Sequence, residues 1–208
     1  MIEPSRPLLL GSASPRRREI LATLGLPLIV VPAVVDETPR PGEAPLDYLA
    51  RVTGAKLAAA ALLPEAASAG ALVVADTTVI LDHRVLGKPA DEAEAASMLR
   101  ALSGRAHRVC TCFAISGPPD FERARHLETI TSRVVFRDLD DEEIAAYAAT
   151  GEGLDKAGAY AIQGIGSFAV ARIEGSYSNV VGLPACEVVA ALKASGLLAR
   201  FPLPRAAG

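Results

Sequence analysis

Short apolar runs typical of buried strands alternate along this chain with longer segments of helical periodicity, and this alternation restricts the fold most strongly. It favours an α/β protein in which helices cover a sheet. Paired runs over 72–88 and 108–136 resemble antiparallel hairpins, so we expect a mixed sheet. The sequence predicts strands over 8–10, 28–31, 71–75, 79–81, 108–115, 127–136 and 168–173, and helices over 15–24, 46–63, 91–102, 140–149 and 184–198.

Composition excludes several classes of function. Among 208 residues, 50% are hydrophobic, which supports a large core formed by one domain or by two lobes around a cleft. Lysine and arginine number 21 against 24 acidic residues, and only 4% of residues are aromatic. This balance argues against binding to a nucleic-acid polymer or a membrane surface. The three cysteines form no disulfide framework and no run of about 20 apolar residues occurs, so we expect a cytoplasmic protein.

A loop of small residues leads into the first helix and carries a candidate phosphate site. Ser14 suits the capping position, and Pro15 suits the first helical position. Ser12, Arg16 and Arg17 add hydroxyl and guanidinium donors where the helix offers free N–H groups. These residues could form an ordinary capped helix with solvated arginines. Because positive charges oppose the helix dipole there, we favour phosphate binding by Ser12, Ser14, Arg16 and Arg17.

Carboxylates that follow apolar runs suggest metal-assisted chemistry. Asp76 opens a polar triplet, 76–78, between two apolar stretches, and Glu37 follows the apolar run 30–35. A turn aspartate is the common alternative for Asp76. Because Mg²⁺ is usually held by one or two carboxylates together with substrate phosphates, we predict a divalent cation at Asp76 and Glu37.

Three lysines and one glutamine lie in unusual settings. Lys56 interrupts an alanine-rich helix, while Lys88 and Lys156 lie next to glycine-containing turns. Each alone could be a solvated surface residue, but together they could neutralise charge on a phosphate leaving group. Gln163, within the glycine-rich segment 158–166, could read the edge of a base. His83, His107 and His126 lack the spacing of a zinc site, and Cys110 and Cys112 are predicted core residues.

Taken together, these motifs resemble the Maf family of nucleoside triphosphate pyrophosphatases. The blocks occur in the family's order over residues 8 to 187. They are Ser12–Arg17, Ala75–Thr77 with Val79, Gly87–Pro89, Leu102–Gly104 with His107, Asp155–Tyr160 with Ile162–Gly164, and Gly175–Tyr177 through Val181–Pro184.

The resemblance implies hydrolysis of a nucleoside triphosphate to its monophosphate and pyrophosphate with Mg²⁺ or Mn²⁺. Asp76 matches the proposed proton acceptor, and Glu37, Lys56, Lys88 and Gln163 match the other polar residues of the family's cleft. Arg16, Thr77 and Gln163 match positions linked to dTTP and UTP specificity, whereas a sister branch prefers 7-methyl-GTP.

The resemblance also implies a fold and a setting. The expected fold is an elongated mixed sheet flanked by helices, with two lobes around a deep cleft, similar to the inosine triphosphate pyrophosphatases. Residues 1–208 would form one such domain, often dimeric, in a family associated with inhibition of septum formation. A nucleotide-binding regulator with little catalysis, or an enzyme that releases orthophosphate, are alternative hypotheses.

Overall fold

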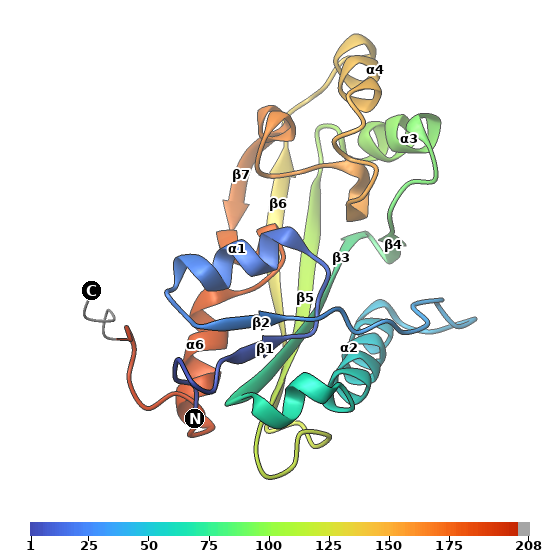
Figure 1. The fold of residues 1–208 in the computed structure, drawn as a ribbon. Coiled ribbons are helices and arrows are strands. Elements are labelled where there is room, and N and C mark those ends of the chain that lie inside the picture. The colour runs from blue at the N-terminus through green and yellow to red at the C-terminus, as the bar shows by residue number, and fades with distance from the viewer. Residues whose placement is uncertain (204–208) are drawn as a thin grey trace. The chain divides into compact units, whose positions relative to one another are not determined.

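The computed structural model describes residues 1–203, so the last five residues of the predicted domain lie outside the described part. Its sheet has the strand order β2-β1-β3-β5-β6-β7, with β4 paired to β3 (Figure 1). β1 runs parallel to β2 and β3, whereas β4 is antiparallel to β3 and β7 is antiparallel to β6. The predicted mixed α/β fold is therefore confirmed. The strands are β1 Leu8–Leu10, β2 Leu28–Val30, β3 Ala71–Leu81, β4 Arg84–Leu86, β5 Ala106–Ser116, β6 His126–Phe136 and β7 Val170–Glu174.

All five predicted helices are present, with ends that differ by a few residues. α3 begins after Asp91, and α4 begins after Asp140, whose side chain forms a capping box with Glu143. None of the helices within residues 1–203 is both long and apolar enough to cross a membrane. The helices are α1 Pro15–Thr23, α2 Pro45–Ala61, α3 Glu92–Leu102, α4 Asp141–Ala149, α5 Tyr177–Val181 and α6 Ala185–Ala194, with 3₁₀ turns η1 Pro64–Ser68, η2 Ala157–Ala159 and η3 Ile165–Ala169.

The polar triplet 76–78 does not divide two strands, and this prediction is wrong. Ala71–Leu81 forms one continuous strand, β3, with Asp76 in its middle. The strand continues because the ammonium of Lys56 lies against the Asp76 carboxylate, which removes the need for the carboxylate to reach water.

The chain forms two compact units. Unit 1 comprises residues 1–76, 112–129 and 182 onward, and unit 2 comprises residues 77–111 and 130–181. The strands β3, β5 and β6 each contribute one part to each unit. The expected cleft shared by two lobes stays a prediction.

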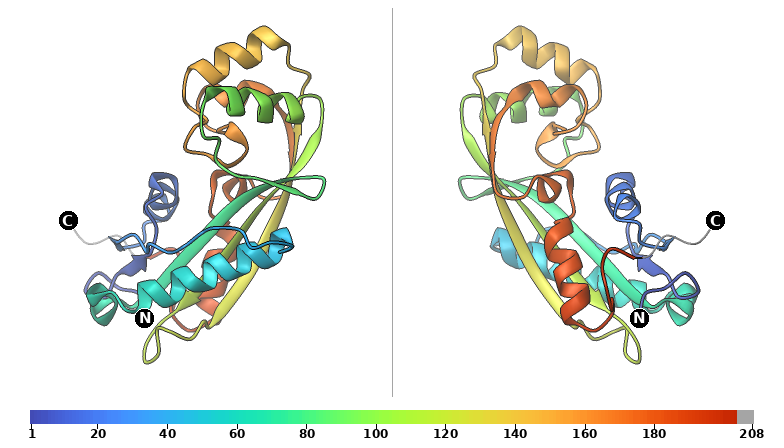
Figure 2. Two further views of the ribbon diagram at one scale, coloured as in Figure 1. Left: turned by 90° about the vertical axis from the view of Figure 1, so that its right-hand side faces the viewer. Right: turned by 90° about the vertical axis from the view of Figure 1, so that its left-hand side faces the viewer.

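Unit 1 has a core between its part of the sheet and α2. Leu9, Leu72 and Val74 of the sheet pack with Leu57 and Ala60 of the helix. Figure 2 shows α2 and α6 on opposite faces of these strands. The buried face of α2 repeats at helical spacing, and Lys56 lies on that face.

Unit 2 has an aromatic core around a buried histidine. His107 is only 2% exposed, and its Nε2 lies 2.8 Å from the Tyr160 hydroxyl oxygen. The rings of Phe136 and Tyr160 meet the imidazole edge to face. Burial lowers the pKa of His107 to about 4 from its usual 6.5, and burial raises the pKa of Tyr160. The histidine is therefore neutral in the folded protein at pH 7.

We expect acidification to destabilise the protein through His107. The unfolded chain takes up this proton near pH 6.5 and the folded protein only near pH 4. The contribution of His107 to the free energy of unfolding is therefore complete above pH 6.5 and is lost as the pH falls toward 4. The loss amounts to at most roughly 3 kcal/mol. Urea unfolding of His107→Gln between pH 7 and 5 should show a weaker loss than the wild type. Exposed His83→Gln is the control, and an equal slope for wild type and His107→Gln would contradict the assignment.

Candidate functional site

The loop before α1 is held by a hydroxyl and a buried arginine. Ser12 Oγ accepts hydrogen bonds from the Ser14 backbone N–H, at 3.2 Å, and from Arg17 Nη1, at 3.0 Å. Arg17 Nε donates to the Gly182 carbonyl oxygen at 2.8 Å, joining segments 165 residues apart. Ser14 is the N-cap of α1, as predicted, but its side chain makes no capping bond. A Cβ at Gly11 would lie 2.8 Å from a Val74 methyl group, so a larger residue there would require the Val74 side chain to move.

Arg17 differs from its two neighbours in its environment. Its side chain is buried, Arg16 is half-buried and Arg18 is exposed. Burial lowers the pKa of the Arg17 guanidinium, whereas the carboxylates of Asp76 and Glu37 raise it. An arginine guanidinium stays charged in a protein at pH 7. The first turn of α1 contains no acidic residue, so its N–H dipoles and arginines form a positive site suited to an anion.

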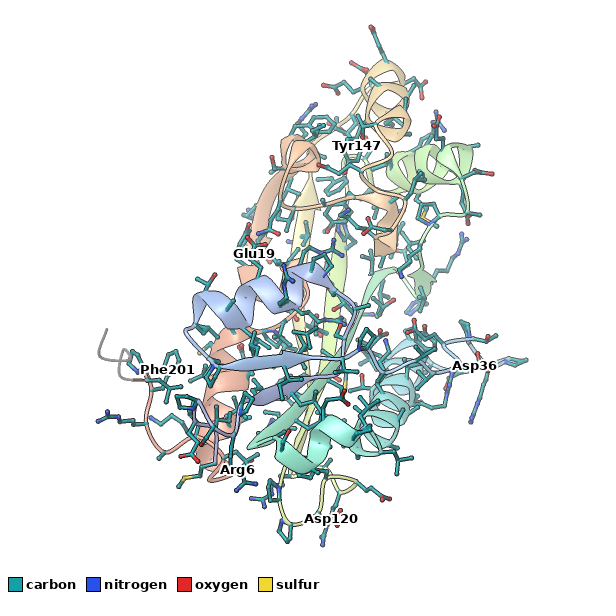
Figure 3. All side chains as sticks on the ribbon, viewed as in Figure 1. Arg6, Glu19, Asp36, Asp120, Tyr147 and Phe201 are labelled. Carbon is teal, nitrogen blue, oxygen red and sulfur yellow. The ribbon has the colours of Figure 1, made fainter. Side chains whose placement is uncertain are left out.

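A lysine between two carboxylates forms the centre of the candidate site. Lys56 Nζ lies 2.7 Å from Asp76 Oδ1 and 2.7 Å from Glu37 Oε1. The Lys56 and Asp76 side chains are nearly buried, while the Glu37 side chain is 48% exposed. Glu37 follows Asp36 on the segment between β2 and α2, where Figure 3 labels Asp36. Helix, strand and loop thus bring Lys56 together with the two carboxylates that the sequence predicts as a metal site.

A tyrosine near this cluster was missed by the sequence reasoning. Tyr48 lies on α2, eight residues before Lys56, and burial together with Asp76 and Glu37 raises its pKa to about 12. The guanidinium carbon of Arg51 lies over the Tyr48 ring, 5.6 Å from the ring centre. The negative charge of this cluster therefore extends to the Tyr48 phenol. No motif in the sequence distinguishes this tyrosine from a surface residue.

Thr77 follows Asp76 in β3 and belongs to a hydrogen-bonded chain in unit 2. Thr77 Oγ1 lies 2.9 Å from Thr111 Oγ1, which donates to the Asn179 backbone oxygen at 3.1 Å. The amide of Asn179 donates to the Val109 carbonyl oxygen and to Ser132 Oγ. The short helix α5 that carries Asn179 was not predicted, although the polar segment 175–179 marks its position.

The other predicted residues also lie in unit 2. Lys88 is exposed and lines a groove of about 420 Å³. Lys156 donates to the Glu152 carbonyl oxygen and pairs with Asp155, so its charge is already compensated. Gln163 is exposed in the turn before η3. The Gly158 N–H donates to the Gly87 carbonyl oxygen at 3.0 Å, which joins the segments that carry Lys88 and Lys156.

Glu152 organises the glycine-rich segment of unit 2. Its carboxylate accepts hydrogen bonds from the N–H groups of Ile165 and Gly166 and from the Tyr147 hydroxyl. Burial alone would raise the pKa of Glu152, but these hydrogen bonds together lower it. Tyr147, labelled in Figure 3, also accepts from the Ala161 N–H. Glu152 thus shapes the segment next to Gln163.

The donor set for a metal ion consists of two carboxylates. Within residues 1–203 no group of three or more histidine, cysteine, aspartate or glutamate side chains could hold a metal. Asp76 and Glu37 both reach one cationic centre, the Lys56 ammonium, so their oxygens converge. Lys56 Nζ occupies the point where these two oxygens meet, so a magnesium ion would bind Asp76 and Glu37 beside the ammonium and take its remaining ligands from phosphates and water.

Comparison with known proteins identifies the family. Residues 7–195 match the family described as Maf-like protein. A dTTP/UTP pyrophosphatase of Citrifermentans bemidjiense is 49% identical over 194 residues, which cover 92% of this chain and 96% of the relative. A protein of the same name from Myxococcus xanthus is 50% identical, over 95% of this chain and 94% of the relative. Another from Cereibacter sphaeroides is 47% identical, over 96% of this chain and 98% of the relative. On this similarity, which spans nearly the whole sequence, the chain belongs to the Maf-like protein family.

Proposed function

We propose that this chain hydrolyses dTTP and UTP to the monophosphate and pyrophosphate. The names of its relatives support the substrate class. The observation that carries the proposal is the pairing of Lys56 with Asp76 and Glu37, close enough to Arg17 for both carboxylates to act on its pKa. The loop before α1 and the Asp76 carboxylate, both in unit 1, would supply the two requirements of phosphoanhydride hydrolysis, which are positioning and charge.

In the proposed reaction, a water molecule attacks the α-phosphorus. Asp76 accepts the proton of this water, and the bond from the α-phosphorus to the oxygen that bridges to the β-phosphorus breaks. Lys56 holds the Asp76 carboxylate in place through the 2.7 Å contact. Pyrophosphate then leaves with the bridging oxygen. Lys56 therefore acts first as an orienting counter-ion, rather than as the leaving-group partner that the sequence alone suggested.

The phosphates would be held mainly by the loop before α1. Ser12, Ser14 and the N–H groups of α1 offer hydrogen bonds, and Arg16 and Arg17 offer charge. In unit 2, Lys88 would offset the charge of the leaving group, whereas Lys156 is already paired with Asp155.

Thr77 and Gln163 would read the base. Both carry hydrogen-bonding groups that pair with the edge of a pyrimidine.

A divalent cation completes the proposed site. Asp76 and Glu37 would hold Mg²⁺ or Mn²⁺ together with phosphate oxygens. Such an ion, when bound, neutralises phosphate charge and lowers the pKa of water.

A substrate panel tests the proposed activity. We expect dTTP and UTP with Mg²⁺ or Mn²⁺ to yield monophosphate and pyrophosphate faster than other nucleoside triphosphates, and EDTA to abolish turnover. Chromatography of the nucleotide and a pyrophosphate assay give the products. Preference for 7-methyl-GTP, release of orthophosphate, or tight binding without turnover would each contradict the proposal. Full activity in EDTA would contradict only the proposed metal ion and would leave the proposed reaction in place.

The cellular location of the protein and its oligomeric state are further proposals. Cys110, Cys112 and Cys186 are free thiols, which fits the reducing cytoplasm. We also propose a homodimer, which light scattering during size-exclusion chromatography would test. A role in septum formation would require a division phenotype that depends on Asp76.

A further inference from the structure

The segment between β2 and α2 carries Glu37 and has no regular structure of its own. Residues 31–44 form neither a helix nor a strand, and the Glu37 side chain is 48% exposed. The ion pair between Glu37 and Lys56 alone would have to offset the conformational freedom that this whole segment loses. A stable position for Glu37 therefore requires further contacts that hold the segment against α2.

Arg51 of α2 supplies such contacts. Its Nε and Nη2 donate to the two carboxylate oxygens of Glu43 at 2.6 and 2.8 Å, and Nη2 donates again to the Thr38 carbonyl oxygen at 3.0 Å. The three N–H groups of these two nitrogens thus meet three acceptors, all of them on the segment 31–44. The Arg51 side chain is 22% exposed and the Glu43 side chain 11%, so this paired fork is partly shielded from water, which strengthens it.

Glu37 is the middle residue of a turn that Arg51 fastens to the helix. The Thr38 N–H donates to Asp36 Oδ1 at 2.9 Å, so the side chain of one neighbour of Glu37 binds the backbone of the other (Figure 3 labels Asp36). The Thr38 carbonyl then accepts from Arg51. The backbone next to Glu37 is therefore tied to α2, the helix that also carries Lys56.

The contacts of Arg51 suit it to hold this segment rather than to bind a phosphate. Its hydrogen bonds lower the pKa of Glu43 to about 2 from the usual 4.5, so the pair stays ionic at neutral pH. The face of the guanidinium lies over the Tyr48 ring. A phosphate that used the Nε and Nη2 donors would have to displace both Glu43 and the Thr38 carbonyl.

We propose that Arg51 is a positioning residue that fixes the segment 36–43 against α2 and thereby keeps the Glu37 carboxylate at Lys56, beside Asp76. Without Arg51, the segment keeps its sequence and its charges but loses the contacts that determine where Glu37 points. Small displacements of a reacting or ligand-holding group cost an enzyme large factors in rate. This inference rests on the proposed function for its effect on activity, because that function gives Glu37 its role.

A double-mutant cycle tests whether Arg51 acts through Glu37. We expect Arg51→Met to lower kcat/KM for dTTP about tenfold in the wild-type background, because the Glu37 carboxylate loses its position. In the Glu37→Gln background the same change should have almost no further effect, because the group that Arg51 positions is already absent. An equal loss in both backgrounds, or no loss in a folded Arg51→Met protein, would overturn the inference.

Two further variants separate position from charge and from general stability. Arg51→Lys keeps the charge but cannot bond Glu43 through two nitrogens and reach the Thr38 carbonyl as well, so it should resemble Arg51→Met. Full activity of Arg51→Lys would mean that charge alone matters and would overturn the inference. Arg100→Met is the matched control, because Arg100 also bonds a carboxylate, that of Asp141, through Nε and Nη2. It should leave kcat/KM unchanged.

Cleavage by a glutamate-specific protease gives a readout that needs no activity. In Arg51→Met, cleavage of the bond between Glu37 and Thr38 should become several-fold faster under native conditions, whereas cleavage after Glu174 in unit 2 should keep its wild-type rate. Arg100→Met should leave the cleavage after Glu37 unchanged. Unchanged cleavage after Glu37 in Arg51→Met would overturn the inference. Failure of the proposed function is distinct, because the wild type would then release no pyrophosphate from dTTP or UTP.

Discussion

Asp76→Asn is expected to lower kcat for dTTP by about a thousandfold while the protein stays folded. Asparagine keeps the shape of the side chain but cannot accept a proton from water. The Lys56 ammonium keeps a carboxylate partner, because Glu37 also lies 2.7 Å from it. The buried charge therefore stays compensated, and the melting temperature should change little. Pyrophosphate release at saturating substrate measures the effect.

Asp47→Asn is the matched control for this prediction. Asp47 is an exposed carboxylate in the first turn of α2, the helix that carries Lys56. Its variant should retain wild-type kcat. Near-normal turnover in Asp76→Asn would remove Asp76 from the role of proton acceptor. A thousandfold higher metal requirement with an unchanged maximal rate would instead identify it as a metal ligand alone.

Lys56→Met is expected to lower the free energy of unfolding by about 3 kcal/mol. The variant removes the cation between two carboxylates and leaves Asp76, which is 8% exposed, without its 2.7 Å partner. Glu37 can turn toward water, since about half of its side chain is already exposed, so Asp76 causes most of the loss. Activity should also fall, because the Asp76 carboxylate loses its orientation.

A double-mutant cycle separates charge from packing in this prediction. Adding Asp76→Asn to Lys56→Met should recover about 1 to 2 kcal/mol in urea unfolding, because the uncompensated charge is gone. Lys193→Met, at an exposed position of α6, should shift stability by less than about 0.5 kcal/mol. Additive losses in the cycle would mean that Lys56 and Asp76 do not interact.

The sequence predicts this fold well where local patterns determine it. Pro15 and the leucines of 8–10 define the first strand and helix, and the apolar periodicity of 46–63 places Lys56 on a helix. The continuity of β3 could not be predicted, because it depends on a lysine twenty residues away that compensates Asp76. The helix α5 was missed for a similar reason, since buried contacts of Asn179 with other strands hold it.

For the candidate site, the sequence predicts which residues take part but not how they are arranged in space. Asp76, Glu37 and Lys56 were each singled out, but only the folded chain shows a single ammonium between two carboxylates. Neither Tyr48 nor the hydrogen-bonded chain through Thr111 belongs to a recognisable sequence motif, because their contacts are with residues distant in sequence.

The bond from Arg17 to Gly182 has a consequence for the order in which the protein matures during translation. Unit 1 is assembled from three stretches, and the last begins at Gly182. A nascent chain therefore carries Ser12 and Arg17 outside the ribosome long before the carbonyl that anchors them has been synthesised. Unit 2 is complete at residue 181. The loop that would hold the triphosphate is thus finished last, so a ribosome-bound chain that stops short of residue 182 should not retain nucleotide.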